Sequence, residues 1–228
     1  MMQHILTKML RFYVLGGPVV GLLAILSVAA LGVILYKLWV FQRAGLGRNA
    51  VLDAAVADWD AGQTAGVSAK LAGARSPFAM VIADAMAEDA IPASQSRVDT
   101  MAEAAIAELE GGFRLLDAIA QTAPLLGLFG TVLGMIEAFQ AMQGAGTSVD
   151  PSVLAGGIWV ALLTTAVGLA VAIPTSLVLT WFEARVARER GWLSGALARV
   201  RAPRMARPLS QDATIAEPDS GETLANAG

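Results

Sequence analysis

The sequence predicts an all-α integral membrane protein with three transmembrane helices and long cytoplasmic helical extensions. Of its 228 residues, 56% are hydrophobic and only 15% are charged, whereas soluble domains have about 45–50% apolar and about 25% charged residues. The excess lies in three apolar runs, residues 12–40, 123–142 and 153–181. Each can cross a bilayer core that needs about 20 helical residues. Each must be helical, because the core offers no water to backbone groups.

The first run is expected to be an uncleaved membrane anchor that follows a short periplasmic N-terminus, residues 1–11. A secretory signal would have a shorter apolar stretch of about 7–15 residues and a cleavage site. Only Lys37 interrupts the run. We expect its amino group to extend to the membrane interface beside Tyr36 and Trp39, as long cationic side chains do near span ends.

Residues 41–122, between the first and second spans, are expected to form a cytoplasmic helical region. Ser76 and Pro77 match the N-cap and first position of a helix. Gly111 and Gly112 mark the expected bend between the last of these helices and the second span. The acidic residues are scattered, as on a solvated helix face. Packing of a helix bundle is therefore favoured over a dedicated binding site.

The placement of Lys and Arg predicts the orientation in the membrane. The link formed by residues 143–152 has neither, and it is expected to be a periplasmic loop. Residues 182–202 are expected to form a cytoplasmic basic helix. The tail, residues 203–228, is poor in large apolar residues and is expected to be disordered. The arginines that decide this orientation are Arg185, Arg188, Arg190, Arg199, Arg201, Arg204 and Arg207.

Small residues recur at helical spacing on one face of the second span and one face of the third. In lipid, helices associate through such residues because they let two backbones approach closely. The two faces therefore predict close packing between these spans or with a neighbouring subunit, although purely structural membrane helices also carry such motifs. The residues expected to pack are Gly127, Gly130, Gly134, Ala161, Gly168 and Ala172.

Glu137 is the acidic residue of the second span. A carboxylate at the centre of a span costs about 2.5–3.5 kcal/mol on insertion scales, and less towards an interface. Taking Thr131 as mid-membrane places Glu137 about 9 Å nearer the outer face, at about 1.5 Å per residue. Glu137 either faces a hydrated ion path or partner helix, or extends outwards to water beside Gln140 and Gln143.

Three threonines are further candidates for an ion pathway: Thr131, Thr164 and Thr165. The alternative for each is a structural hydrogen bond to a carbonyl of its own helix. Pro124 and Pro174 remove backbone hydrogen bonds inside the spans. They mark either kinks or tolerated irregularities.

Several function classes find no support in the sequence. Cysteine is absent and His4 is the only histidine, so thiolate metal sites and histidine-based catalytic triads lack their components. No basic stripe with interleaved aromatic residues suggests nucleic-acid binding. We therefore expect neither an enzyme nor a bound cofactor or metal.

Two segments resemble the proton-channel family to which ExbB, TolQ and MotA belong. TAPLLGLFGTVLGMIEAF, residues 122–139, is similar to the second-span signature of that family, and GIWVALLTTAVGLAVAIP, residues 157–174, to the third. Three spans favour its ExbB and TolQ branch. The resemblance implies a pentamer around a single-span partner similar to ExbD or TolR, with Thr131 and Thr165 on the pore face. Proton flow would then transmit force to a TonB-like protein for outer-membrane transport.

One departure affects the ion pathway. Many relatives have a third-span glutamate where this chain has Val160. Either Glu137 supplies the acid from the facing helix, or that acid is dispensable. A TolQ-like motor subunit that maintains the envelope, and a non-conducting membrane scaffold, are the alternatives to an ExbB-like role. The choice between proton and sodium stays open.

Overall fold

The computed structural model describes residues 2–74, 76–87, 92–144 and 151–202, and the described part is all helical. Three of its helices are long and apolar enough to cross a membrane. The fold class predicted from the sequence is therefore confirmed. The predicted tail and most of the predicted periplasmic loop lie outside the described residues. The helices, in chain order, are α1 (Met2–Arg43), α2 (Ala50–Asp60), α3 (Val67–Ala72), α4 (Phe78–Ala87), α5 (Pro92–Glu110), α6 (Phe113–Gly144) and α7 (Pro151–Arg201).

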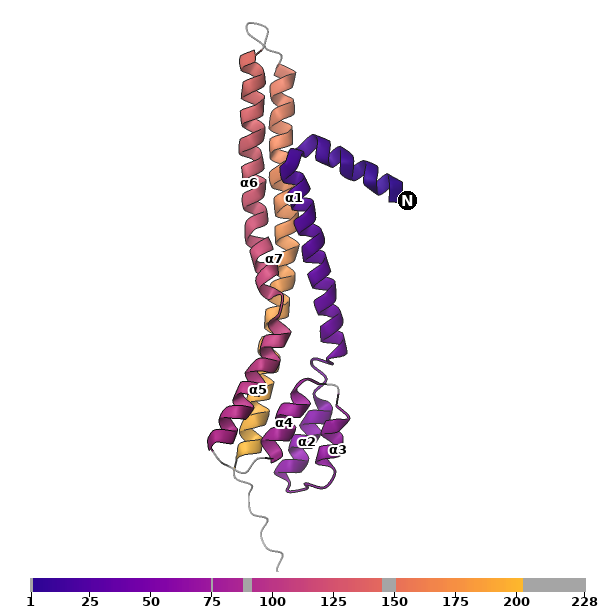
Figure 1. Ribbon diagram of the computed structural model, residues 1–228, viewed down its shortest axis with the longest axis vertical. Coiled ribbons are helices and arrows are strands. Elements are labelled where there is room, and N and C mark those ends of the chain that lie inside the picture. Colours follow the sequence, from indigo (N-terminus) through magenta and orange to yellow (C-terminus); the bar gives the residue numbers. More distant parts are fainter. Residues whose placement is uncertain (1, 75, 88–91, 145–150, 203–228) are drawn as a thin grey trace, which may run out of the picture.

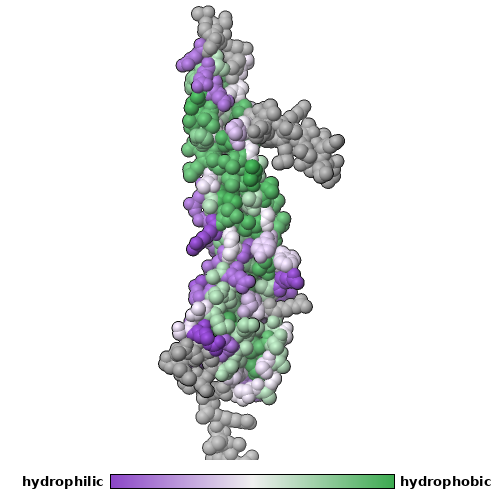
Figure 2. All heavy atoms as spheres, viewed as in Figure 1, coloured by the Kyte–Doolittle hydropathy of each residue, from purple (hydrophilic) through white to green (hydrophobic). Residues whose placement is uncertain are grey.

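Helices α6 and α7 form a long antiparallel hairpin, and α1 lies against it (Figure 1). Val19 and Leu23 of α1 are buried against Ala123 of α6 and Ala172 of α7. Hydrophobic side chains gather on the stretch where the three helices run together (Figure 2). Many of them, such as Leu128, are more than half exposed in the isolated chain, as expected for surfaces that face lipid or another subunit.

Helix α1 changes direction at Gly17 (Figure 1). Gly17 has φ 64° and ψ −167°, which is a conformation that only glycine adopts readily, and Pro18 follows it. The apolar run that we expected to be one span, residues 12–40, is thus divided. From Gly17 to Arg43, α1 has the length and composition of a membrane span.

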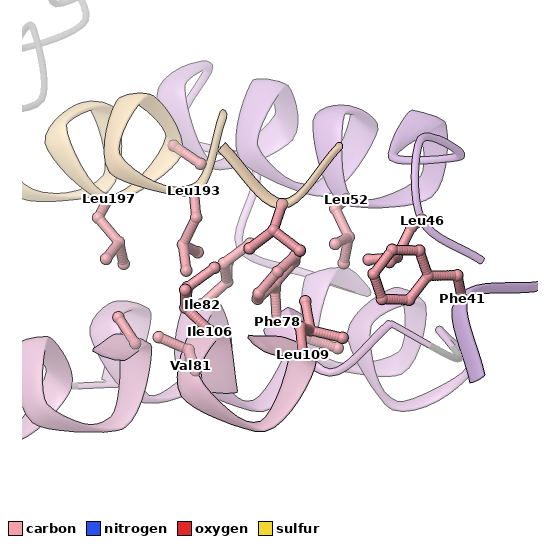
Figure 3. Packing of buried hydrophobic residues seen from close by; sticks show 14 of the residues in the cluster. Phe41, Leu46, Leu52, Phe78, Val81, Ile82, Ile106, Leu109, Leu193 and Leu197 are labelled. Atoms are coloured by element: carbon pink, nitrogen blue, oxygen red, sulfur yellow. The ribbon is translucent and has the colours of Figure 1, made fainter. Parts of the chain in front are cut away.

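Helices α2 to α5 form a bundle around the end of α7 that leaves the hydrophobic stretch (Figure 1). Its core contains Leu52, Phe78, Ile82 and Ile106, which pack with Leu193 of α7 (Figure 3). The bundle packing predicted for this region is confirmed. Because the bundle packs on α7, it lies on the same side of the membrane as the end of that helix.

Capping residues mark the start of α4 and the end of α2, and the start predicted at Ser76 and Pro77 is confirmed. The Ser76 hydroxyl accepts a hydrogen bond from the Phe78 backbone N–H at 3.3 Å, as an N-cap does, with Pro77 between them. Gly62, with φ 76°, follows the end of α2, and its N–H donates to the carbonyl of Trp59. Both features follow from ordinary helix capping.

Arginines of α7 are paired with acidic residues of the bundle, although the scattered acids of this region are expected from the sequence to lie on a solvated face. Arg199 donates to Asp60 of α2, and Arg201 contacts Asp99 of α5 at 2.7 Å. Arg190 lies between two acids of α5, Glu103 and Glu110. Exposed pairs contribute only about 0–1 kcal/mol each, so they align the bundle on α7 more than they stabilise it.

Lys37 lies in a different place from the one we expected. Only 4% of it is exposed, and its amino group donates to the carbonyls of Glu108 and Leu109, at 3.3 and 3.2 Å. These carbonyls end α5, where the chain turns at Gly111–Gly112 before α6 begins. The last carbonyls of a helix lack partners within the helix. Lys37 satisfies two of them instead of extending to the interface.

Replacing Lys37 with methionine is therefore expected to destabilise the protein, although the aliphatic stem is largely kept. Hydrogen bonds from charged groups contribute about 1.5–3 kcal/mol, and we expect a loss of that size in the free energy of unfolding in detergent. Lys70→Met is the matched control, because the Lys70 side chain is 48% exposed and pairs on the surface with Asp58. Equal effects of the two changes would contradict a capping role for Lys37.

Candidate ion pathway

The candidate site lies in the hairpin of α6 and α7, where small residues bring the two backbones together. A Cβ atom placed on Gly168 would lie 2.6 Å from the carbonyl oxygen of Ala123 and 3.2 Å from the Cα of Gly127. One placed on Gly127 would lie 2.9 Å from the carbonyl oxygen of Thr164. No real Cβ atom has such neighbours, so the close approach of the helices requires glycine at both positions.

The same contact continues along the hairpin. A Cβ atom on Gly130 would lie 2.6 Å from the Thr164 hydroxyl oxygen, and one on Gly134 would lie 3.1 Å from the Cβ of Ala161. Ala161 and Ala172 are buried, the latter against Ala123. The structure thus brings together all six residues that are predicted from the sequence to pack in the hairpin.

Thr164 is fully enclosed in this contact. It is 2% exposed, and its hydroxyl donates to Ala161 O in its own helix at 2.7 Å. The hydroxyl also lies 3.1 Å from Gly127 O, across the hairpin. Both acceptors are carbonyls, so the single hydroxyl proton is shared between them. This side chain links α6 to α7.

Thr165, the next residue of α7, differs from Thr164. Its Oγ1 is buried but has no hydrogen-bond partner among the described residues. An unsatisfied buried hydroxyl costs about 1–3 kcal/mol, and such groups are rare in folded proteins. The hydroxyl of Thr165 is therefore available to a water, an ion or a group of another chain.

Thr131 lies at about the same depth in the hairpin as Thr165. Gly130 faces Thr164, and the next residue of each antiparallel helix lies about 1.5 Å from that contact in the opposite direction, so Thr131 and Thr165 differ by only about 3 Å in depth. Thr131 is half-buried, and its hydroxyl donates to Leu128 O at 2.7 Å. Its oxygen keeps acceptor capacity for a further partner.

Glu137 is exposed and lines a cavity of about 410 Å³ between α1, α6 and α7. Pro18 from the break in α1 lines the same cavity, as do Thr164 and Val160 from α7. Glu137 therefore reaches the cavity that position 160 also lines. A carboxylate from α6 can serve this cavity although α7 carries valine there.

The residues predicted from the sequence to pack in the hairpin do not include Ala138, which directly follows Glu137. In the structure Ala138 is buried, and a Cβ atom on Gly157 would lie 2.5 Å from its Cβ. Residues three and four positions beyond Gly134 lie on the same side of the helix, and only one can occupy the centre of the contact. Ala138, which has the smaller side chain, occupies the centre. It continues the helical spacing of Ala123, Gly127 and Gly134, and this spacing could have identified it.

The two candidate kink positions lie inside unbroken helices. Pro124 is in α6, Pro174 is in α7, and both helices continue through them. Pro124 directly follows Ala123, whose carbonyl faces Gly168. A role of either proline as a hinge stays a prediction.

These features define a class of protein: a helical membrane protein whose second and third spans form a tight hairpin that carries buried hydroxyls. The family model of the MotA/TolQ/ExbB proton channel family matches residues 73–193, which include α4, α5, α6 and α7 as far as Leu193. The chain belongs to this family.

Named relatives agree with this assignment. A putative biopolymer transport protein, ExbB-like 1, of Synechocystis is 34% identical over 75% of this chain and 69% of its own length. The biopolymer transport protein exbB1 of Vibrio cholerae is 42% identical, over 36% of this chain and 37% of its own length. The Tol-Pal system protein TolQ of Haemophilus influenzae is 40% identical over 36% of this chain and 35% of its own length. The chain thus spans only about a third of the length of the Vibrio and Haemophilus relatives.

Proposed function

We propose that this chain is an ExbB-like subunit of an ion-driven motor in the bacterial inner membrane. It would convert proton motive force into mechanical force for TonB-dependent transport across the outer membrane. The observation that carries the proposal is the buried Thr165 hydroxyl, which lacks a partner among the described residues of a hairpin held together by glycines. A pathway for protons needs such a polar group within the membrane.

The other parts of the motor are proposed from the family. The subunit would assemble as a pentamer around a single-span partner of the ExbD or TolR kind, which would bring the proton-carrying acid. Large exposed hydrophobic residues on α6 and α7, such as Phe129 and Leu162, support contacts beyond the single chain. Moving one charge through the membrane is worth about 2.3 kcal/mol per 100 mV, so the ion gradient would supply the energy.

The proposed orientation has the N-terminus in the periplasm and the C-terminus in the cytoplasm. The arginines of α7 and the bundle that packs on it lie on one side of the membrane, and the positive-inside rule assigns that side to the cytoplasm. The TolQ relative favours a second candidate, a motor subunit that maintains the cell envelope. A non-conducting scaffold is the third.

The test is energised uptake of an iron–siderophore complex in cells that lack the native subunit and express Thr165→Val. We expect uptake to be lost while the protein stays in the membrane and retains its partner in a pull-down. Thr180→Val is the matched control. Thr180 is an exposed threonine of the same helix, and its hydroxyl donates to the backbone carbonyl of Ser176. Normal uptake with sensitivity to detergent would favour the TolQ-like role. Full tolerance of Thr165→Val in both assays would favour the scaffold.

A further inference from the structure

A second cavity lies where α1 and α7 leave the hydrophobic stretch. Its volume is about 640 Å³, and it is lined by the end of α1, by the loop that follows and by α7. Leu38 and Phe41 of α1 and Trp181 of α7 provide its apolar and aromatic walls. Trp181 closes the third apolar run, and tryptophans concentrate at the level of the lipid headgroups. The cavity therefore spans the boundary between acyl chains and headgroups.

Two arginines line this cavity, Arg48 from the loop and Arg185 from α7. The Arg185 guanidinium donates to the carbonyl of Leu46, and its Nε lies 3.9 Å from the carboxylate of Glu189. That carboxylate also accepts a hydrogen bond from the Asn49 amide at 2.9 Å. Arg185 is thus partly neutralised and held in place. Arg48 is exposed and has no ion pair with any described residue, so the cavity keeps a positive charge.

The loop is shaped around the Arg185 side chain. Gly47 has φ 80°, and a Cβ atom at this position would collide with the guanidinium. Only glycine fits this conformation and this contact together. The loop therefore holds a cation at the mouth of an apolar cavity, an arrangement that is not needed for packing of the bundle core.

We propose that this cavity binds the phosphate group of an anionic phospholipid such as phosphatidylglycerol. The two guanidinium groups would donate to the phosphate oxygens, a geometry that arginine favours, and an acyl chain would lie along Leu38, Phe41 and Trp181. None of the lining residues is acidic, so the cavity offers no partner to the amine of a zwitterionic lipid. Basic pockets beside membrane helices recognise anionic headgroups by these means.

The test is lipid retention by the purified full chain in detergent, measured by native mass spectrometry with phosphatidylglycerol or phosphatidylcholine added. We expect preferential adducts with phosphatidylglycerol, and Arg48→Gln should weaken its binding about five- to ten-fold. Arg43→Gln is the matched control. It removes the same charge nearby, but Arg43 is exposed, lies 4.8 Å from the Trp39 ring centroid and does not line the cavity. It should bind lipid as the wild type does.

Three outcomes would overturn the proposal. Equal retention of phosphatidylcholine would show that the headgroup charge is not recognised. Equal losses in the Arg43 and Arg48 variants would show that only the overall surface charge matters. Complete displacement of the lipid by millimolar glycerol phosphate would show a site for small soluble phosphates that needs no acyl chain. Because Arg48 is exposed and forms no ion pair with a described residue, its replacement is not expected to impair folding.

Discussion

Replacing Gly168 with alanine is expected to push α6 and α7 apart and to lower the stability of the protein substantially. The added methyl group would lie 2.6 Å from the carbonyl oxygen of Ala123 and 3.2 Å from the Cα of Gly127. Both neighbours are backbone atoms, which cannot move aside by a change of rotamer. Overpacking of this kind costs about 1–3 kcal/mol or more, and we expect a loss of at least that size in the free energy of unfolding in detergent.

Gly156→Ala provides the matched control in the same helix. A Cβ atom at Gly156 has no neighbour within 4 Å, so the same chemical change meets open space there. Alanine also has the higher helix propensity, by about 1 kcal/mol. We expect Gly156→Ala to leave stability unchanged or slightly higher. Equal free energies of unfolding for Gly168→Ala and Gly156→Ala would contradict the close backbone contact at Gly168.

Adjacent threonines of α7 are expected to respond oppositely when each is replaced by valine. Thr164→Val removes the hydroxyl that bridges to Gly127 O across the hairpin. Hydrogen bonds between membrane helices contribute about 0.6–2 kcal/mol, so this variant should lose that much stability. Thr165→Val removes a buried hydroxyl without a partner among the described residues. It should be as stable as the wild type, or more so, because the cost of an unsatisfied group disappears.

The activity of the two variants is expected to rank in the opposite order to their stability. Thr165→Val should abolish ion-driven work in a fully folded protein, whereas Thr164→Val should retain activity in proportion to the folded protein that remains. Thr165→Ser, which keeps the hydroxyl, should rescue activity. Thermal unfolding and uptake, measured on the same preparations and strains, separate the two effects. A large loss of stability in Thr165→Val would mean that its hydroxyl has a structural partner.

Composition and spacing predicted those features that depend on neighbouring residues in the sequence. Runs of apolar residues locate the spans because the bilayer core demands a minimum helix length. The spacing of Gly127, Gly130 and Gly134 identifies a face because helix geometry fixes which residues share it. The Ser76 cap is similarly local. Nothing in these signals depends on how distant segments meet.

Features that depend on distant contacts were missed. Lys37 resembles any cation near the end of a span, and only the fold shows that the carbonyls ending α5 lie beside it. Thr164 and Thr165 are the same residue type, and only the position of α6 decides that the Thr164 hydroxyl has a partner across the hairpin. Likewise, the acids of the bundle look like a solvated surface until α7 brings its arginines to them, as Arg199 meets Asp60.

The most direct test of the account is proton flux through the purified complex, with its single-span partner, in liposomes under an imposed membrane potential. A pH-sensitive dye inside the vesicles reports the flux. The account predicts flux for the wild type and for Thr165→Ser, and a loss of flux for Thr165→Val at equal amounts of folded complex. Undiminished flux through Thr165→Val would contradict a role of this hydroxyl in the ion path, and the proposed motor mechanism would lose the observation that carries it.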